Sequence, residues 1–254
     1  MASRWADKYP VIPVGNAWAP KAVTLVYPFY DNARFFARQC AEFWQACPIE
    51  LRRYVKAIVV DDGSPRRVEI PLNTPFPLRL FRIEKDVPWN WLAARNIGAF
   101  EAAESWLLLT DMDHVIPAET FRSLVNGAHN PTCSYFFSRR DHTGKVIPPH
   151  SASFFLTRKR FWDVGGYDET LSGHYGTDGE FRRRLAPIAP IHVVPEELIR
   201  YESVDDASTI RYRRKLPEDA TAVAALVKAR GPHWTPKVLS FPYHEVSLEA
   251  PCSA

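Results

Sequence analysis

Short apolar segments alternate with segments of helical periodicity along the first half of the chain. Four of the apolar segments are typical of buried strands because they are rich in β-branched and aliphatic residues. They are residues 22–28, 55–60, 78–83 and 106–110. Residues 31–47 place apolar side chains on one helical face, with Asp31 or Asn32 as the N-cap, and a second helix is expected over 90–104. This alternation predicts a single α/β domain, with a central, mostly parallel mixed sheet and helices on both faces.

The second half of the chain has a looser pattern. A helix is expected from Pro117, strands over 133–139 and 151–157, and another helix over 178–185. The last residues are rich in proline and aromatic side chains, which suggests an extended cover on the domain. We expect three parts: an N-terminal extension (1–21), the main domain (22–205), and a C-terminal helix and tail packed on it (206–254).

Composition agrees with a folded globular protein. The chain has 254 residues, 46% hydrophobic and 24% charged, and a formal net charge of +3 that does not by itself indicate nucleic-acid binding. No apolar run approaches the roughly 20 residues that cross a bilayer, and the N-terminal residues show no signal-peptide pattern. The four cysteines form no CxxC pair or even ladder, so we expect neither a disulfide nor a zinc framework and favour a cytoplasmic location.

Polar side chains follow three of the predicted strands. Tyr30-Asp31-Asn32 follows the first, Asp61-Asp62-Gly63-Ser64 the second, and Asp111-Met112-Asp113-His114 the fourth. Ligands of open α/β sheets bind outside the carboxyl ends of the strands. Three polar strand ends therefore predict one site at this edge of the sheet.

The two carboxylates after the fourth strand suit a metal ion. In extended backbone Asp111 and Asp113 point to the same side and Met112 to the other. Paired carboxylates favour a hard divalent cation such as Mg²⁺ or Mn²⁺, although a solvated turn at the end of a strand could have the same sequence. His114 would point away from Asp113 on a regular strand, so its part in such a site stays open.

Six segments in order resemble the GT-A glycosyltransferases of the inverting family 2. They are "VTLVYPFYDN", "VVDDGS", "AARNIGAFEA", "LLLTDMDHV" with its DxD motif, "FWDVGGYDE" and "TDGEFRRRL". The resemblance covers roughly residues 22–200. It implies a Rossmann-like GT-A domain with a nucleotide-sugar half (about 22–115) and an acceptor half (about 116–205).

The resemblance also implies a reaction and its residues. A sugar would move from a nucleotide-diphosphate sugar, with a UDP-sugar favoured, to an acceptor hydroxyl, with Asp178 as general base and Mn²⁺ or Mg²⁺ on Asp113 and Asp111. The implied donor-site residues are Pro28, Tyr30, Asp61, Asp62, Arg95, Asp111 and Asp113. Acceptor-side candidates are Trp89, Trp91, His150, Tyr167, Thr177 and Glu180.

Two positions depart from the family pattern. Thr177 stands where the family has a glutamate before the base, and the late histidine that often binds the metal is missing. His192 or Glu202 could replace that histidine, or fewer protein ligands could suffice.

Two other functions and several partners fit parts of the pattern. An apolar strand ending in Asp-x-Asp is also the nucleophile motif of haloacid-dehalogenase-type phosphatases, although that motif normally opens their domain. An inactive nucleotide-sugar-binding module is a third interpretation. A glycan or lipid-linked glycan is the expected acceptor, with the protein cytoplasmic or peripheral to a membrane. Only the basic stretches at 182–184 and 211–215 favour a nucleic acid.

Overall fold

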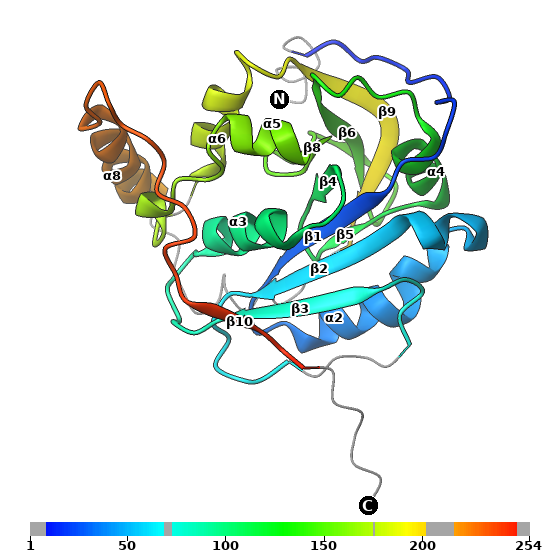
Figure 1. Cartoon of the computed structure of the whole chain (residues 1–254), viewed down its shortest axis with the longest axis horizontal. Coiled ribbons are helices and arrows are strands. Elements are labelled where there is room, and N and C mark those ends of the chain that lie inside the picture. The colour runs from blue at the N-terminus through cyan, green and yellow to red at the C-terminus, as the bar shows by residue number, and fades with distance from the viewer. Residues whose placement is uncertain (1–8, 69–72, 175, 202–215, 248–254) are drawn as a thin grey trace, which may run out of the picture.

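A central ten-stranded sheet organises the protein, with helices on both of its faces (Figure 1). The structure is a computed structural model that describes residues 9–68, 73–174, 176–201 and 216–247. The architecture confirms the predicted α/β fold with a mixed central sheet.

The helices and strands have the following bounds. The strands are β1 (Val23–Phe29), β2 (Val55–Asp61), β3 (Leu78–Ile83), β4 (Trp106–Leu109), β5 (His114–Val115), β6 (Ser134–Asp141), β7 (Val146–Ile147), β8 (Phe154–Thr157), β9 (Ile191–Arg200) and β10 (Tyr243–Glu245). The helices are α2 (Ala33–Arg38), α3 (Trp91–Glu101), α4 (Ala118–Asn126), α5 (Arg158–Asp163), α6 (Asp178–Leu185) and α8 (Leu216–Lys228). The shorter turns are η1 (Gln39–Phe43), η2 (Trp44–Ala46), η3 (Ile49–Tyr54) and η4 (Glu169–Leu171).

The four strands predicted in the first half form the parallel part of the sheet. The order across the sheet is β10-β3-β2-β1-β4-β8-β6-β9-β5, with β7 paired to β6. β1 pairs in parallel with β2 on one side and with β4 on the other. β8, β5 and β10 run antiparallel to their neighbours, whereas β9 is parallel to β6. The carboxyl ends of β1, β2 and β4 therefore meet at one edge, as the three polar strand ends predict.

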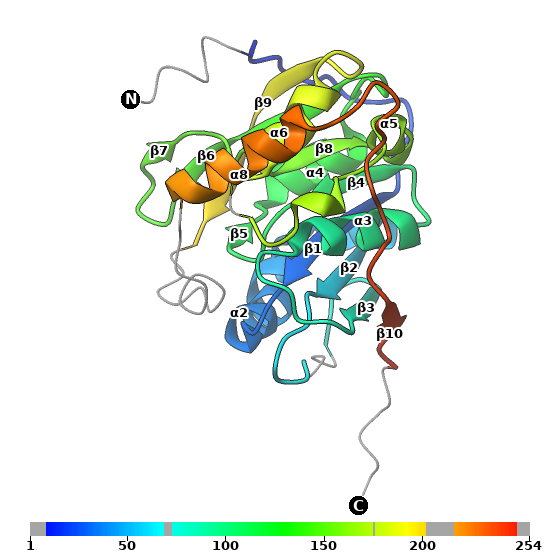
Figure 2. The same ribbon diagram turned by 90° about the vertical axis from the view of Figure 1, so that its left-hand side faces the viewer.

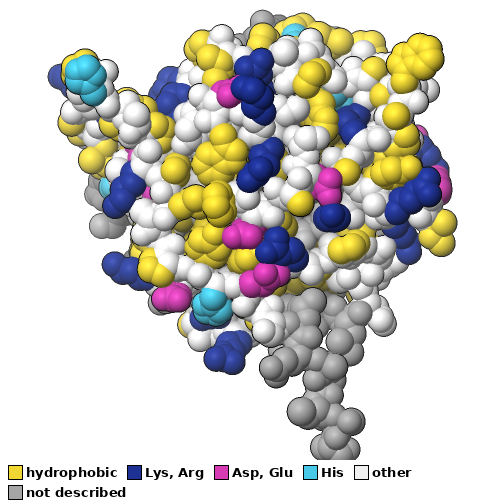
Figure 3. Space-filling model, viewed as in Figure 1, with side chains coloured by type: hydrophobic (Ala, Val, Ile, Leu, Met, Phe, Trp, Pro, Cys, Tyr) yellow, Lys and Arg dark blue, Asp and Glu magenta, His cyan; other side chains and the backbone are white. Residues whose placement is uncertain are grey.

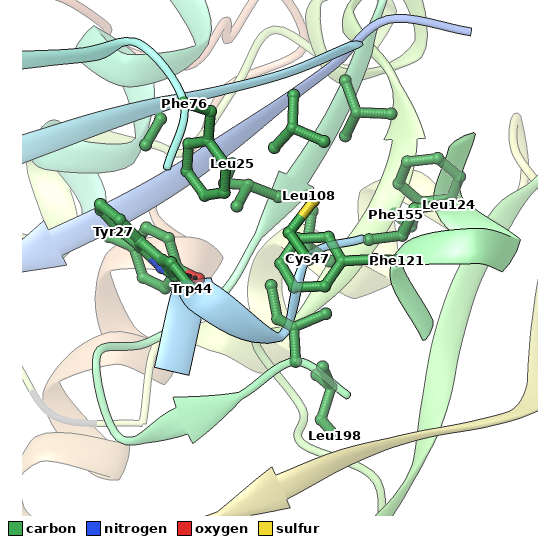
Figure 4. Packing of buried hydrophobic residues seen from close by; sticks show 14 of the residues in the cluster. Leu25, Tyr27, Trp44, Cys47, Phe76, Leu108, Phe121, Leu124, Phe155 and Leu198 are labelled. Carbon is green, nitrogen blue, oxygen red and sulfur yellow. Dashed lines mark hydrogen bonds between the residues drawn. The ribbon is translucent and has the colours of Figure 1, made fainter. Parts of the chain in front are cut away.

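Both faces of the parallel strands are buried, which explains their continuous apolar runs. In β1, Leu25 and Tyr27 face one core cluster and Val26 faces the other. Helices α2 and α4 cover the first cluster, where Trp44 and Phe121 pack on the sheet (Figure 4). Helices α3, α5 and α6 cover the second cluster.

The C-terminal segment adds the edge strand β10 beside β3, at the other end of the strand order from β5. It runs from α8 past α3 to β10, which pairs antiparallel with β3 (Figure 2). The pairing brings Tyr243 opposite Ile83, and the hydroxyl of Tyr243 donates to Glu101 of α3 at 2.8 Å. This segment therefore covers an edge that would otherwise expose unpaired backbone groups.

The first helix is shorter than its apolar periodicity suggests. Its N-cap is Asn32, whose side chain accepts a hydrogen bond from the backbone N–H of Phe35, so one of the two predicted caps is confirmed. The α-helix ends at Arg38 and continues as the π-turn η1, which begins at Gln39. Single π-turns within helices often occur at functional sites.

The close packing of α3 on β1 leads to a stability prediction. A Cβ atom on Gly98 would overlap Cγ1 of Val26, whereas the nearest atom to a Cβ on Gly179 of α6 is a side-chain nitrogen of Arg182 at 3.8 Å. Gly98→Ala should lower the free energy of unfolding by about 1–3 kcal/mol through overpacking. Gly179→Ala, the matched helical control, should leave it unchanged or raise it by up to about 1 kcal/mol. Urea denaturation followed by circular dichroism measures both, and equal stability of the two variants would contradict this account of Gly98.

Candidate functional site

A turn, rather than an extended strand, carries the two aspartates after β4. β4 ends at Leu109, and the backbone N–H of His114 donates to the carbonyl of Asp111 at 3.1 Å. The expectation that Asp111 and Asp113 share one side of an extended strand is therefore wrong. Because the chain turns back before β5, His114 comes to the same place as the acids.

Hydrogen bonds from Gln39 stabilise this turn. Its buried Nε2 donates to the carbonyls of Met112 at 2.8 Å and His114 at 2.7 Å. The π-turn that begins at Gln39 is the point where the helix meets the turn. Sequence reasoning missed Gln39, since a glutamine within an amphipathic helix gives no signal of such a contact.

Asp111 shares its two oxygens between a buried arginine and a histidine. Nη2 of Arg95 donates to Oδ1 at 2.5 Å, and Nε2 of His150 lies 3.4 Å from Oδ2. Burial is the largest influence and raises the pKa of Asp111, but Arg95, His150 and His114 together outweigh it and the pKa lies below its ordinary value. Asp111 is thus ionised at neutral pH.

Asp113 faces a different pair of basic groups. Nδ1 of His114 lies 3.0 Å from its Oδ1, and Nε of Arg200 lies 3.5 Å from its Oδ2. Burial raises the pKa of Asp113. His114 and Arg200 act in the opposite direction, and the pKa lies well below its usual range. Each acid thus has an arginine beside it, Arg95 for Asp111 and Arg200 for Asp113.

Asp111, His114 and His150 form a candidate metal centre. One ligand atom from each residue lies within 4.8 Å of the other two. Both ring nitrogens of His114 are buried and make no hydrogen bond of good geometry within the described part of the chain. Burial lowers the pKa of His150 to about 4, so its imidazole is neutral at pH 7 and able to bind a metal ion. The residues present thus fit a divalent cation.

The end of β2 carries two acids with different surroundings. Asp61 accepts hydrogen bonds from the backbone N–H of Ser64 at 2.9 Å and from Arg82 at 2.8 Å, so it stabilises the turn. Asp62 is buried, and its Oδ1 has no hydrogen-bond partner among the described residues. Burial and the neighbouring charge of Asp61 raise the pKa of Asp62 well above its usual range.

β1 brings the other two predicted donor-site residues to the same edge. Pro28 pairs with Val60, and the N–H of Asp62 donates to the carbonyl of Phe29 at 2.8 Å. The hydroxyl of Tyr30 donates to the carboxylate of Asp86 at 3.3 Å. The structure therefore places Pro28, Tyr30 and Asp62 beside one another.

Asp178 lies close to the same centre. It is the first residue of α6, and both Asp178 and Asp111 act on the buried phenol of Tyr167, whose pKa is raised to about 12 mainly by burial. The hydroxyl of Tyr167 accepts a hydrogen bond from Nη1 of Arg95 at 3.3 Å. Thr177, just before α6, is buried with no hydrogen-bond partner for Oγ1 among the described residues.

Glu180 and the two tryptophans have structural contacts. The carboxylate of Glu180 accepts hydrogen bonds from Arg184 at 2.7 Å and from Arg230 at 2.5 Å. These two arginines therefore already engage it. The Trp91 ring packs against Tyr167 at 5.1 Å between centroids and lies 4.9 Å from the guanidinium of Arg95. Trp89 is partly exposed and has a φ of 51°.

Of the two suggested late ligands, the structure places His192 away from the cluster. His192 lies near the start of β9, eight residues before Arg200, which pairs with His114. At about 3.3 Å per residue, roughly 26 Å of strand separates the two positions. Glu202 lies outside the described residues.

Two motifs far apart in sequence are joined by hydrogen bonds that were not expected. Asn96 donates to the carbonyl of Tyr167 and to Glu169, both at 2.8 Å. Glu169 also accepts from the backbone N–H groups of Leu239 at 2.8 Å and Ser240 at 2.7 Å. The sequence shows both motifs, but no spacing rule predicts a contact across some seventy residues.

Comparison with known proteins identifies the family. The sequence profile described as Glycosyl transferase family 2 matches residues 49–182, which is more than half of the chain. The chain therefore belongs to glycosyl transferase family 2. No curated protein sequence matches it.

Solved structures share the fold at low sequence identity. TarS of S. aureus in complex with UDP-GlcNAc superposes with a TM-score of 0.61 at 15% identity, over 81% of this chain and 65% of that one. GalNAc-T7 with UDP, GalNAc and Mn²⁺ gives 0.56 at 14% identity, over 73% of this chain and 44% of that one. The mannosyltransferase PcManGT of Pyrobaculum calidifontis with GDP-Man and Mn²⁺ gives 0.52 at 16% identity, over 91% and 81%. The chain spans less than two thirds of the length of TarS. These structural similarities confirm the predicted GT-A fold.

No described helix combines the length and the apolar character that crossing a membrane requires.

The contact of Gln39 with the turn leads to a prediction about metal binding. Gln39→Met keeps the side-chain length but removes both hydrogen bonds, so the turn should loosen and Mn²⁺ affinity should fall about tenfold or more, while folding stability drops by about 1–3 kcal/mol. Gln45→Met, in the same region but exposed, is the control and should change neither. Calorimetric titration with Mn²⁺ measures the affinity. Unchanged affinity in Gln39→Met would show that the turn keeps its shape without this residue.

Proposed function

We propose that the protein is an inverting glycosyltransferase that moves a sugar from a nucleotide-diphosphate sugar to an acceptor hydroxyl. The observation that carries the proposal is the gathering of Asp111, His114 and His150 beside Arg95 at the carboxyl end of β4. Family membership supports glycosyl transfer over the phosphatase alternative. Asp111 is also ion-paired with Arg95, which suits an electrostatic role better than nucleophilic attack.

Asp111, His114 and His150 would hold the metal ion. Two imidazoles beside a carboxylate favour Mn²⁺ over Mg²⁺, which prefers oxygen ligands. Asp113, 3.0 Å from Nδ1 of His114, would orient that ring as carboxylates do for many metal-bound histidines, or bind the ion itself. When bound, such an ion acts as a Lewis acid toward the diphosphate leaving group.

Asp62 would read the nucleotide, with Pro28 and Tyr30 lining the same pocket. Its buried Oδ1 lacks a partner in the part of the chain that the structure describes, and a polar atom in that state gains from a ligand that supplies a hydrogen bond. Asp61 would support it by holding the turn. A UDP-sugar is the favoured donor. The similar structures contain UDP-GlcNAc, UDP or GDP-Man, which supports a nucleotide-sugar donor in general.

Asp178 would remove the proton from the acceptor hydroxyl. In the inverting reaction the acceptor oxygen attacks the anomeric carbon as a carboxylate takes its proton, on the side opposite the leaving diphosphate. The position of Asp178 at the start of α6, within electrostatic range of Tyr167 as Asp111 is, agrees with that role. Trp89 and Thr177 remain acceptor-side candidates.

A glycan or lipid-linked glycan is the proposed acceptor. On the face seen in Figure 3, basic and acidic side chains are interspersed and form no continuous basic surface. Of the two basic stretches, Arg184 is engaged with Glu180, and residues 211–215 lie outside the described part of the chain. The charge pattern of this face therefore gives little support to a nucleic-acid acceptor.

A ligand panel tests the donor and the metal. UDP-, GDP-, CMP- and dTDP-sugars with and without Mn²⁺ should yield at least one pair that raises the melting temperature, with Mn²⁺ increasing the shift. Asp111→Asn and His114→Ala should remove most of the increase due to Mn²⁺. His244→Ala, on the distant edge strand β10, should not. Stabilisation by beryllofluoride and by no nucleotide sugar would favour the phosphatase alternative instead.

The general base is tested by separating turnover from donor binding. Asp178→Asn should reduce kcat by a factor of about 10²–10⁴ because the amide cannot accept the proton, while the donor Kd stays within about twofold. Asp163→Asn, at the end of α5, is a matched control that should keep full turnover. Loss of donor affinity in Asp178→Asn would contradict the base assignment. Metal-dependent donor binding without any transfer by the wild type would favour an inactive binding module.

A further inference from the structure

Arg139 is a half-buried cation with no counter-ion in contact among the residues that the structure describes. It lies in β6, and within the described residues its side chain makes no hydrogen bond or ion pair. Its Nε atom is fully buried and unpaired. Because a buried polar atom without a partner is costly, this position would gain from a group that the described residues do not supply.

The register of the sheet places Arg139 at the acidic cluster. Asp141 of β6 is opposite Arg200 of β9, which in turn is opposite His114 of β5. Arg139 lies two residues before Asp141 and thus on the same face of β6. Burial lowers the pKa of Arg139, whereas the charges of Asp113 and Asp111 raise it, so both carboxylates are within electrostatic range of the guanidinium.

The two aspartates do not require Arg139 for their own compensation. Asp111 is paired with Arg95 at 2.5 Å, and Asp113 faces Arg200 at 3.5 Å and His114 at 3.0 Å. Arg139 therefore adds a positive charge beyond those that the acids already have in contact. A guanidinium remains protonated at all relevant pH values and presents a planar set of donors that matches phosphate oxygens.

We propose that Arg139 binds the diphosphate of the donor, with the exposed Arg200 beside it; this inference rests on the proposed function. As the bond from the acceptor oxygen to the anomeric carbon forms, the bond from that carbon to the phosphate oxygen breaks, and its electron pair stays on the phosphate. Arg139 lies where it stabilises this added negative charge. Part of the affinity for nucleoside diphosphates is then independent of the metal.

Nucleotide binding with and without metal tests the inference. UDP, GDP, UMP and GMP are titrated calorimetrically into the wild type and into Arg139→Met, Arg139→Gln and Arg139→Lys, in EDTA and in Mn²⁺. Loss of one charge-assisted contact should weaken binding of the diphosphate in EDTA about 10- to 100-fold and binding of the monophosphate by much less, and lysine should restore part of the loss. Arg140→Met is the control, because Arg140 lies on the opposite face of β6 and pairs with Glu197 at 2.6 Å.

The outcomes separate this inference from the proposed function. If the wild type binds no nucleoside diphosphate under either condition, the proposed function fails and this inference with it. If the wild type binds but folded Arg139→Gln or Arg139→Met binds the diphosphate equally well, only the role of Arg139 is overturned. An unchanged diphosphate Kd with a raised acceptor KM would assign Arg139 to the acceptor instead and would also overturn the inference.

Discussion

The buried guanidinium of Arg95 connects the parts of the candidate site. Its side chain is completely inaccessible to solvent, and it donates to Asp111, to the hydroxyl of Tyr167 and to the carbonyl of Ala152. These partners belong to the turn after β4, the segment before α6 and the segment before β8. Loss of the guanidinium would leave the half-exposed carboxylate of Asp111 without its closest counter-charge and would remove the donor to two further groups. The relative positions of Asp111 and Tyr167 thus depend on one side chain of α3.

The parts of the site that the sequence predicts are those set by strand ends. The parallel arrangement of β1, β2 and β4 brings Pro28, Asp62 and Asp111 to one edge, and the alternation of apolar strands with helices is enough to predict it. His114 was harder to place, because a regular strand would turn it away and only the turn after β4 brings it to Asp111. His150 comes from a loop whose path depends on tertiary contacts, since its Nδ1 pairs with Ser153 at 2.9 Å. Local pattern therefore predicts the edge of the sheet but not the side chains that loops deliver to it.

The C-terminal segment is part of the support of the site, although the family profile ends at residue 182. Arg230 donates to Asp168 at 2.6 Å and to Glu180 at 2.5 Å, and its guanidinium lies 3.6 Å from the centre of the Trp234 ring. Asp168 belongs to the Gly-Gly-Tyr-Asp-Glu segment, and Glu180 lies two residues after Asp178 in α6. A buried network of this kind stabilises only when every charge has its partner. Glu180, an acceptor-side candidate from the sequence, thus helps to position the helix that carries Asp178.

Charge compensation explains why acids follow a buried strand in this fold. Before any ligand binds, Arg95 and Arg200 lie beside Asp111 and Asp113 and partly offset their charges. An ion held by Asp111, His114 and His150 would share Asp111 with Arg95 and would face the fixed charges of Arg139 and Arg200. A diphosphate brings the negative charge that makes both the ion and these arginines favourable neighbours. On the proposed function, donor and metal therefore strengthen each other's binding by the same factor, because a coupling free energy between two ligands is reciprocal.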